Sequence, residues 1–118
     1  MEITVSIKKK TLIVSLSGEL DHHTAKEVKN LVEEIIKNRD ILNLVFDFSH
    51  LDFMDSSGIG VIVGRYKLIN SLGGKVAIAN PSKNVDRLLN MSGIKKLIGI
   101  YDNVNCAIKY LQEEALHG

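Results

Sequence analysis

One short apolar run constrains the fold of this chain more than any other feature. Residues 42–48 read Leu-Asn-Leu-Val-Phe-Asp-Phe. The run is brief and rich in aromatic and β-branched side chains, a pattern that favours a strand covered on both of its faces. Such a strand lies inside a sheet and needs other elements packed over it. The run therefore predicts a layered fold of helices and strands.

The remaining apolar residues predict strands and helices that alternate along the chain. Residues 3–7 and 12–16 alternate apolar and polar side chains around a lysine-rich turn, which predicts an antiparallel hairpin whose second strand ends at Gly18. Short apolar segments at 75–79 and 97–101 predict two further strands. Apolar residues at helical spacing predict four helices, over residues 24–37, 56–71, 82–92 and from 103 onward.

The order of these elements is β-β-α-β-α-β-α-β-α. We expect a single α/β domain over residues 1–118, with a mixed four- to five-stranded sheet and about four helices packed against it. Thr24 and Glu27 fit a capping box at the first helix, Gly93 fits the end of the third, and Met91 is expected to pack near that end. We expect the last two residues to be frayed.

Composition and charge exclude several classes of function. The 15 basic and 14 acidic residues give a net charge of +1, so the chain has no electrostatic bias toward nucleic acid or anionic membranes. The single cysteine, Cys106, allows no intrachain disulfide. The first residues lack the pattern of a signal peptide, and no apolar run approaches the length of a membrane span. We expect a cytoplasmic protein that is monomeric when alone and does not insert into membranes.

Three loops follow predicted strands and lead into helices, the place where sites form in open α/β sheets. They are residues 18–23, 49–57 and 80–82. In the middle loop Asp55 is placed as the N-cap of the second helix, and Ser56 and Ser57 would be the first helical residues. From these residues alone, a simple capping motif is the commoner explanation.

The start of this second helix has two further properties. Gly58 and Gly60 each cost about 1 kcal/mol relative to alanine inside a helix. They imply either close packing against a strand or a surface left bare for a partner. A phosphate on Ser56 would face the positive end of the helix dipole, although Asp55 adds a neighbouring negative charge. Phosphorylation there would change the surface charge strongly and the fold little.

Enzyme and nucleotide-binding functions would need motifs that this chain lacks. A hydrolase would use Ser56 or Ser57 as nucleophile with His22 or His23 as base, but the G-x-S-x-G elbow is absent. A nucleotide site would use glycines whose spacing matches neither G-x-G-x-x-G nor a P-loop, namely those at 58, 60 and 64. We expect no catalytic residue and no cofactor.

A receiver domain and a metal site are equally incomplete in this sequence. A receiver domain would carry its phosphate on Asp47 or Asp55, but the early acidic pair that binds magnesium is missing. A metal site could use Asp21, His22 and His23, but adjacent histidines point apart on most backbones and no further ligand is near in sequence. We interpret that loop as polar, with capping and contact roles.

Two stretches of the sequence carry a family resemblance. Residues 18–25, Gly-Glu-Leu-Asp-His-His-Thr-Ala, and 53–61, Phe-Met-Asp-Ser-Ser-Gly-Ile-Gly-Val, resemble the signature stretches of the anti-sigma factor antagonists, which are STAS domains. The similarity covers essentially the whole chain. The paired histidines at 22 and 23 resemble the sporulation antagonists rather than those of stress responses.

The resemblance implies a partner-switching cycle. The unphosphorylated antagonist binds an anti-sigma factor and frees the sigma factor, here sporulation sigma F, or alternatively a general stress sigma factor. The anti-sigma factor is also a serine kinase, and it phosphorylates the antagonist on the first serine after the aspartate, which is Ser56. A PP2C-like phosphatase restores the active form. The implied docking surface consists of Asp21, His22, Asp55, Ser56, Ser57, Gly58, Ile59 and Gly60.

Overall fold

The predicted central strand lies in the middle of a mixed sheet. The computed structural model describes residues 1–117, with side chains to residue 113, so the expected fraying at Gly118 lies outside the described residues. Within that range the sheet has five strands in the order β1-β2-β3-β4-β5. The strands are β1 (Glu2–Lys8), β2 (Thr11–Leu20), β3 (Asn43–Met54), β4 (Val76–Ala79) and β5 (Gly99–Tyr101).

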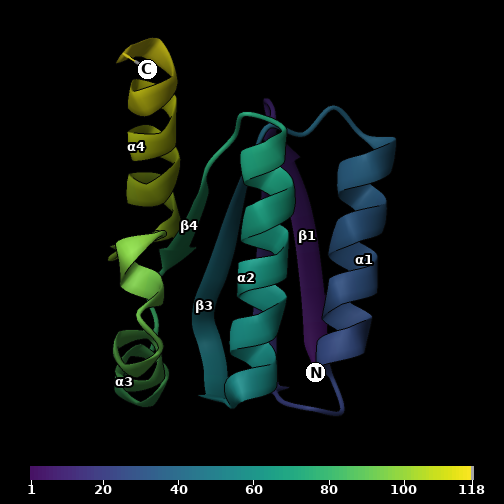
Figure 1. Ribbon diagram of the computed structural model, residues 1–118, viewed down its shortest axis with the longest axis vertical. Helices are drawn as coiled ribbons and strands as arrows, with labels where there is room; N and C mark the ends of the chain where they lie inside the picture. The colour runs from purple at the N-terminus through teal and green to yellow at the C-terminus, as the bar shows by residue number, and fades with distance from the viewer. Residues whose placement is uncertain (118) are drawn as a thin grey trace.

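The hairpin and the parallel crossovers are confirmed. β1 and β2 are antiparallel, whereas β2, β3, β4 and β5 follow one another in parallel. The described chain also forms four α-helices and a short 3-10 helix, η1 (Ile94–Lys96). The helices are α1 (Ala25–Asn38), α2 (Ser56–Ser71), α3 (Lys83–Ser92) and α4 (Val104–His117). Figure 1 shows α1 and α2 side by side in front of the sheet.

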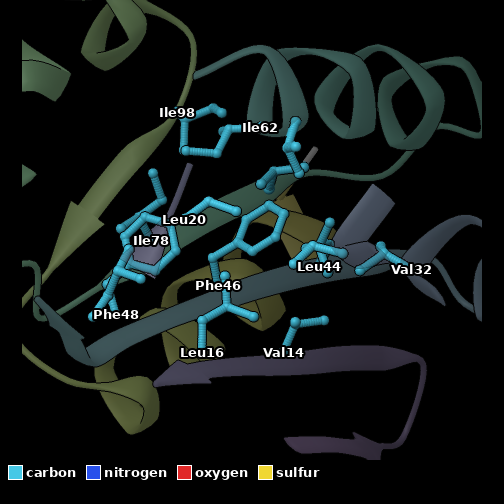
Figure 2. Close-up of a cluster of buried hydrophobic side chains, with 14 of the residues drawn as sticks. Val14, Leu16, Leu20, Val32, Leu44, Phe46, Phe48, Ile62, Ile78 and Ile98 are labelled. Carbon is cyan, nitrogen blue, oxygen red and sulfur yellow. The ribbon is translucent and has the colours of Figure 1, made fainter. Parts of the chain in front are cut away.

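β3 is covered on both faces, as its apolar run predicts. Phe46 and Phe48 point into a cluster formed with neighbouring strands and helices, including Ile62 of α2 (Figure 2). On the opposite face, Val45 belongs to a second cluster that includes Ala107 of α4. Burying a side chain of this size contributes roughly 1.5–3 kcal/mol. The two clusters fix β3 between layers of helices, and this fixes the position of its carboxyl end.

The prediction that residues 49–54 form a loop is wrong. They continue β3 to Met54, and β2 continues through Gly18 to Leu20 beside it. Leu51 and Met54 are buried, but the polar residues around them hide the strand pattern in the sequence. Gly18 does not end its strand. It adopts a φ of 110° next to a shift in register between the two strands.

Helix ends are predicted better than helix faces. Ser82 accepts a hydrogen bond from the N–H of Val85 at 3.3 Å, and Gly93 ends α3 with a φ of 78°. Met91, however, is 78% exposed, so its expected packing role is wrong. The last strand is also shorter than predicted, because the N–H groups of Leu97 and Ile98 donate back to the carbonyl of Ile94 in η1.

The buried face of α2 agrees only in part with the one that helical spacing predicts, which consists of Ile59, Ile62, Val63, Tyr66 and Ile69. The buried residues are Gly58, Val61, Ile62, Arg65 and Ile69, whereas Ile59, Val63 and Tyr66 are only partly buried. Apolar residues surround the first half of this helix, so their spacing alone does not distinguish one face from another. The charged Arg65 would not be assigned to a core face by hydrophobicity.

A glycine after α2 makes a close approach that a side chain would prevent. A Cβ atom on Gly74 would collide with the backbone carbonyl of Leu42. We expect Gly74→Ala to lower the free energy of unfolding by about 1–3 kcal/mol, because the collision is with backbone that is held in the sheet. Chemical denaturation measures this change.

Gly64→Ala is the matched control. Gly64 lies inside α2, and a Cβ atom there would meet no atom within 4 Å. This variant should raise stability by up to about 1 kcal/mol through helix propensity. Equal stability of the two variants would contradict the close approach at Gly74.

Candidate functional site

The carboxyl ends of β2 and β3 lie side by side. Leu20 is paired with Met54, and the N–H of Asp55 donates to the carbonyl of Leu20 at 3.2 Å. The chain leaves both strands at this level, and α1 and α2 begin shortly afterward. Their first turns lie at the same end of the molecule (Figure 1). Two segments that are more than thirty residues apart in sequence therefore meet at one surface.

Asp55 is the N-cap of α2, as predicted. Its Oδ1 atom accepts from the backbone N–H of Ser57 at 2.8 Å, and its own backbone is extended. Ser56 and Ser57 are therefore the first two residues of the helix. Ser56 is exposed and Ser57 is partly buried. Within the described residues, the Ser56 hydroxyl makes no hydrogen bond, so it is free to meet another molecule.

The first loop is held by Asp21, and the predicted Thr24–Glu27 capping box is wrong. Oδ1 of Asp21 accepts from the backbone N–H groups of His23 at 2.9 Å and Thr24 at 3.1 Å. The Thr24 hydroxyl instead donates to the carbonyl of Glu19 at 2.8 Å. The chain turns at Asp21, before the first helical residue, so the threonine is used to close the turn.

These contacts favour the ionised form of the Asp21 carboxyl group. Burial alone would raise the pKa of its carboxyl group. The hydrogen bonds from Thr24 and His23, with the charge of His23, more than offset that effect and lower the pKa below its usual value. The carboxylate therefore stays ionised beside the start of α1. Together with Asp55 it places two carboxylates at the strand ends beside Ser56, so further negative charge on that serine would be repelled.

The two early glycines of α2, Gly58 and Gly60, lie in different surroundings. A Cβ atom on Gly58 would collide with the side chain of Met54 and come within 3.1 Å of Leu20, so this glycine permits close packing. Gly60 is exposed, and a Cβ atom there would meet nothing within 4 Å. Packing accounts for Gly58 and leaves Gly60 as bare backbone on the surface.

The third predicted loop begins beside Ser49, at the start of the second predicted loop, rather than beside Asp21 and Asp55. β4 ends at Ala79, which pairs with Asp47, whereas β3 continues for seven residues beyond that pair. Asn80 accordingly contacts Ser49, where its side-chain amide donates to the hydroxyl at 3.4 Å. Asp47 is partly buried and accepts from the Ser15 hydroxyl at 3.1 Å.

The paired histidines, His22 and His23, are both exposed. The ring centroids of His22 and His23 are 5.8 Å apart, in an edge-to-face arrangement. In the part of the chain that the structure describes, no group of three or more His, Cys, Asp or Glu side chains could hold a metal ion. In the same part, no helix has both the length and the apolar character needed to cross a membrane.

Sequence reasoning missed two side chains near this surface. Phe53 is 47% exposed and lies next to the last residue of β3, Met54. The alternation of strand side chains would have placed it outward once Met54 was placed inward. Arg65 is only 5% exposed, and its Nη2 atom lies 2.9 Å from Oε1 of Glu33 in α1. Burial lowers the pKa of Arg65, and the charge of Glu33 opposes that effect.

Comparison with known proteins gives one consistent family. Residues 2–107 match the family model of the STAS domain. The chain is 46% identical over 112 residues to an anti-sigma F factor antagonist of Paenibacillus polymyxa, and the match covers 95% of this chain and 96% of that protein.

Two solved structures of SpoIIAA are similar over most of their length. The anti-sigma factor antagonist SpoIIAA in its unphosphorylated form gives a TM-score of 0.85 at 26% identity, covering 95% of this chain and 97% of the other. The Bacillus cell fate determinant SpoIIAA in its phosphorylated form gives 0.74 at 25% identity, covering 92% and 98%. The match over residues 2–107, the extent of these similarities and the shared sheet and helix order show that this chain belongs to the STAS domain family, in the group of the anti-sigma factor antagonists.

Proposed function

We propose that this protein binds an anti-sigma factor when Ser56 is unmodified and that phosphorylation of Ser56 turns this binding off. The exposed, unbonded hydroxyl of Ser56 at the start of α2 is the observation that carries the proposal. The controlled sigma factor would be sporulation sigma F, because the relative with 46% identity is an anti-sigma F factor antagonist. The anti-sigma factor would be the serine kinase, and a PP2C-type phosphatase would reverse the modification.

The chemistry assigned to this chain is that of a substrate. In phosphoryl transfer the kinase supplies the nucleotide, the metal and the groups that position the nucleophile. The chain has to present a hydroxyl that an active site can surround, and Ser56 meets that requirement because it is exposed at the start of α2, beyond the carboxyl end of β3. We therefore infer that the protein is a regulator and not an enzyme.

A phosphate on Ser56 would act mainly through charge. It would sit at the positive end of the α2 dipole, which tolerates an anion. It would also stand next to Asp55 and near Asp21, so the docking surface would gain about two negative charges where two carboxylates already lie. The fold would change little, whereas the charge of the surface that a partner meets would change strongly. SpoIIAA, to which this chain is similar, has been solved in both phosphorylation states.

The proposed docking surface spans both strand ends. It includes Asp21 and His22 from the first loop and the start of α2, with Asp55, Ser56, Ser57, Ile59 and Gly60. Gly58 is buried against Met54, so it would shape this surface without touching a partner. The exposed Phe53 extends the surface with an apolar contact of the kind that interfaces favour.

We expect Ser56→Ala to abolish phosphorylation by the cognate anti-sigma kinase and ATP. The variant should stay folded and stay bound to the kinase, because the only group lost is the acceptor hydroxyl. Mass spectrometry of the reaction and a pull-down of the complex measure these two outcomes. Ser57→Ala is the matched control and should still be phosphorylated. Loss of phosphorylation in Ser57→Ala with retention in Ser56→Ala would show that Ser56 is not the acceptor.

We expect Ser56→Asp to weaken binding to the anti-sigma factor at least about tenfold, because it places an unpaired charge within the docking surface. Circular dichroism should show an unchanged fold, and calorimetric titration measures the affinity. Asn84→Asp is the control, since it adds the same charge in the first turn of α3 at an exposed position. Equal affinities for the two variants would contradict the proposal that negative charge at Ser56 blocks binding of the anti-sigma factor.

We expect Gly60→Ala to stabilise the fold by up to about 1 kcal/mol and yet weaken partner binding. The methyl group has free space in the isolated chain, but it would stand between the helix backbone and a docked partner. Gly64→Ala offers the same gain in helix propensity farther along α2, beyond the proposed surface, and its binding should be unchanged. Full affinity in Gly60→Ala would show that the bare backbone is not a contact.

A further inference from the structure

A hollow separates the first halves of α1 and α2. Its volume is about 390 Å³, and its polar lining comes from Lys26, Lys29 and Asn30 of α1 and from Ser57 and Arg65 of α2. The proposed switch at Ser56 uses neither lysine and does not use the arginine. Ser57 belongs to both regions, because it follows the acceptor directly and its side of the helix faces α1.

Arg65 is the unusual member of this lining. One of its nitrogen atoms, Nη2, is paired with Glu33 at 2.9 Å. Its Nε and Nη1 atoms are buried and make no hydrogen bond with any described residue. A guanidinium group carries five N–H donors, and a buried donor without a partner is costly. Such donors normally have an acceptor in the protein, in ordered water or in a bound group, so these two are available to a molecule that enters the hollow.

The charge around the hollow is unbalanced. Three cations line it, and no carboxylate belongs to the lining within the described residues. Glu33 neutralises Arg65 from the side, and among the described residues neither Lys26 nor Lys29 has a salt bridge. Two positive charges are left unmatched at a place where the positive ends of two helix dipoles converge. A dianion would match them.

From this geometry we propose that the hollow between α1 and α2 binds a phosphate group, either as inorganic phosphate or as part of a phosphate monoester. The two unpartnered groups of Arg65, Nε–H and Nη1–H, lie on different sides of the guanidinium, so each can donate a single hydrogen bond, one of them to an oxygen of an oxyanion in the hollow. Lys26 and Lys29 supply charge from flexible stems, and the Ser57 hydroxyl and the Asn30 amide can complete the hydrogen bonds. A phosphate monoester carries close to two negative charges at neutral pH, whereas a carboxylate carries one.

The test uses the isolated isotope-labelled protein and no partner. We expect titration with inorganic phosphate at constant ionic strength to give saturable shifts of the Ser57 and Gly60 amides, with Kd in the millimolar range or tighter. The Arg65 Nε–H signal should move as it gains an acceptor, a change that a purely structural arginine would not show. Acetate should bind about tenfold more weakly, since it brings one charge.

Variants of the two lysines keep the proposal falsifiable even if changes at Arg65 disturb folding. The double variant Lys26→Gln/Lys29→Gln alters exposed positions and should weaken phosphate binding about tenfold. Lys37→Gln and Lys67→Gln, on exposed positions of the same helices outside the lining, should leave it unchanged. Arg65→Lys keeps the charge but removes the guanidinium N–H donors, and it should weaken phosphate binding and change the shift pattern.

Three results would overturn the proposal. They are shifts that do not saturate, an unchanged affinity in the double lysine variant, and acetate binding as tightly as phosphate. Ser56→Ala should bind phosphate like the unaltered protein. Because this titration contains neither kinase nor anti-sigma factor, its failure would leave the proposed switch untouched, and failure of the switch would leave the phosphate site untouched.

Discussion

The parallel pairing of the last residues of β2 with the last residues of β3 is the constraint on which the rest of the functional surface depends. Leu20 and Met54 are buried and paired, and each is followed directly by an aspartate that holds the turn into a helix. β4 ends at Ala79, opposite Asp47 of β3. If β3 also ended at that level, α2 would start near Ser49, and the starts of α1 and α2 would lie apart. The seven additional residues of β3 therefore bring the loop of Asp21 next to the segment of Asp55 and Ser56.

The fold follows from the sequence because its main signals are local and repeated. The apolar run of β3, the alternating hairpin and the helical spacing each point to one element, and their order permits few topologies. The end of β3 escapes prediction because Ser49, His50 and Asp52 interrupt the pattern, while the buried Leu51 and Met54 gain their meaning only from the neighbouring strand. Strand length is decided by tertiary pairing, which spacing in one segment does not contain.

At the candidate site, too, local features are predicted from the sequence, and features that depend on tertiary contacts are not. Asp55 as a cap is a local feature and is predicted correctly. At α1 Thr24 is the N-cap residue as predicted, but the capping box is wrong, because the threonine hydroxyl closes the turn after β2. Gly58 and Gly60 look alike in sequence, yet one packs on Met54 and the other is open. Arg65 is beyond sequence reasoning altogether, because an arginine is expected on the surface and only the partner Glu33 on α1 makes its burial possible.

The geometry of α2 also gives a physical reason to separate Ser56 from Ser57. Successive side chains of a helix point about 100° apart. Ser57, Val61 and Arg65 follow one another at intervals of four, so Ser57 faces α1 together with the arginine, while Ser56 faces outward. A kinase can surround an outward hydroxyl, but it would have to enter the space between two packed helices to reach the other. A phosphate on Ser57 would be neutralised by the lysines and Arg65, whereas a phosphate on Ser56 would add to the carboxylates of Asp21 and Asp55. Under the proposed function, phosphorylation of the outward serine would therefore change the charge that a partner meets more than phosphorylation of Ser57 would.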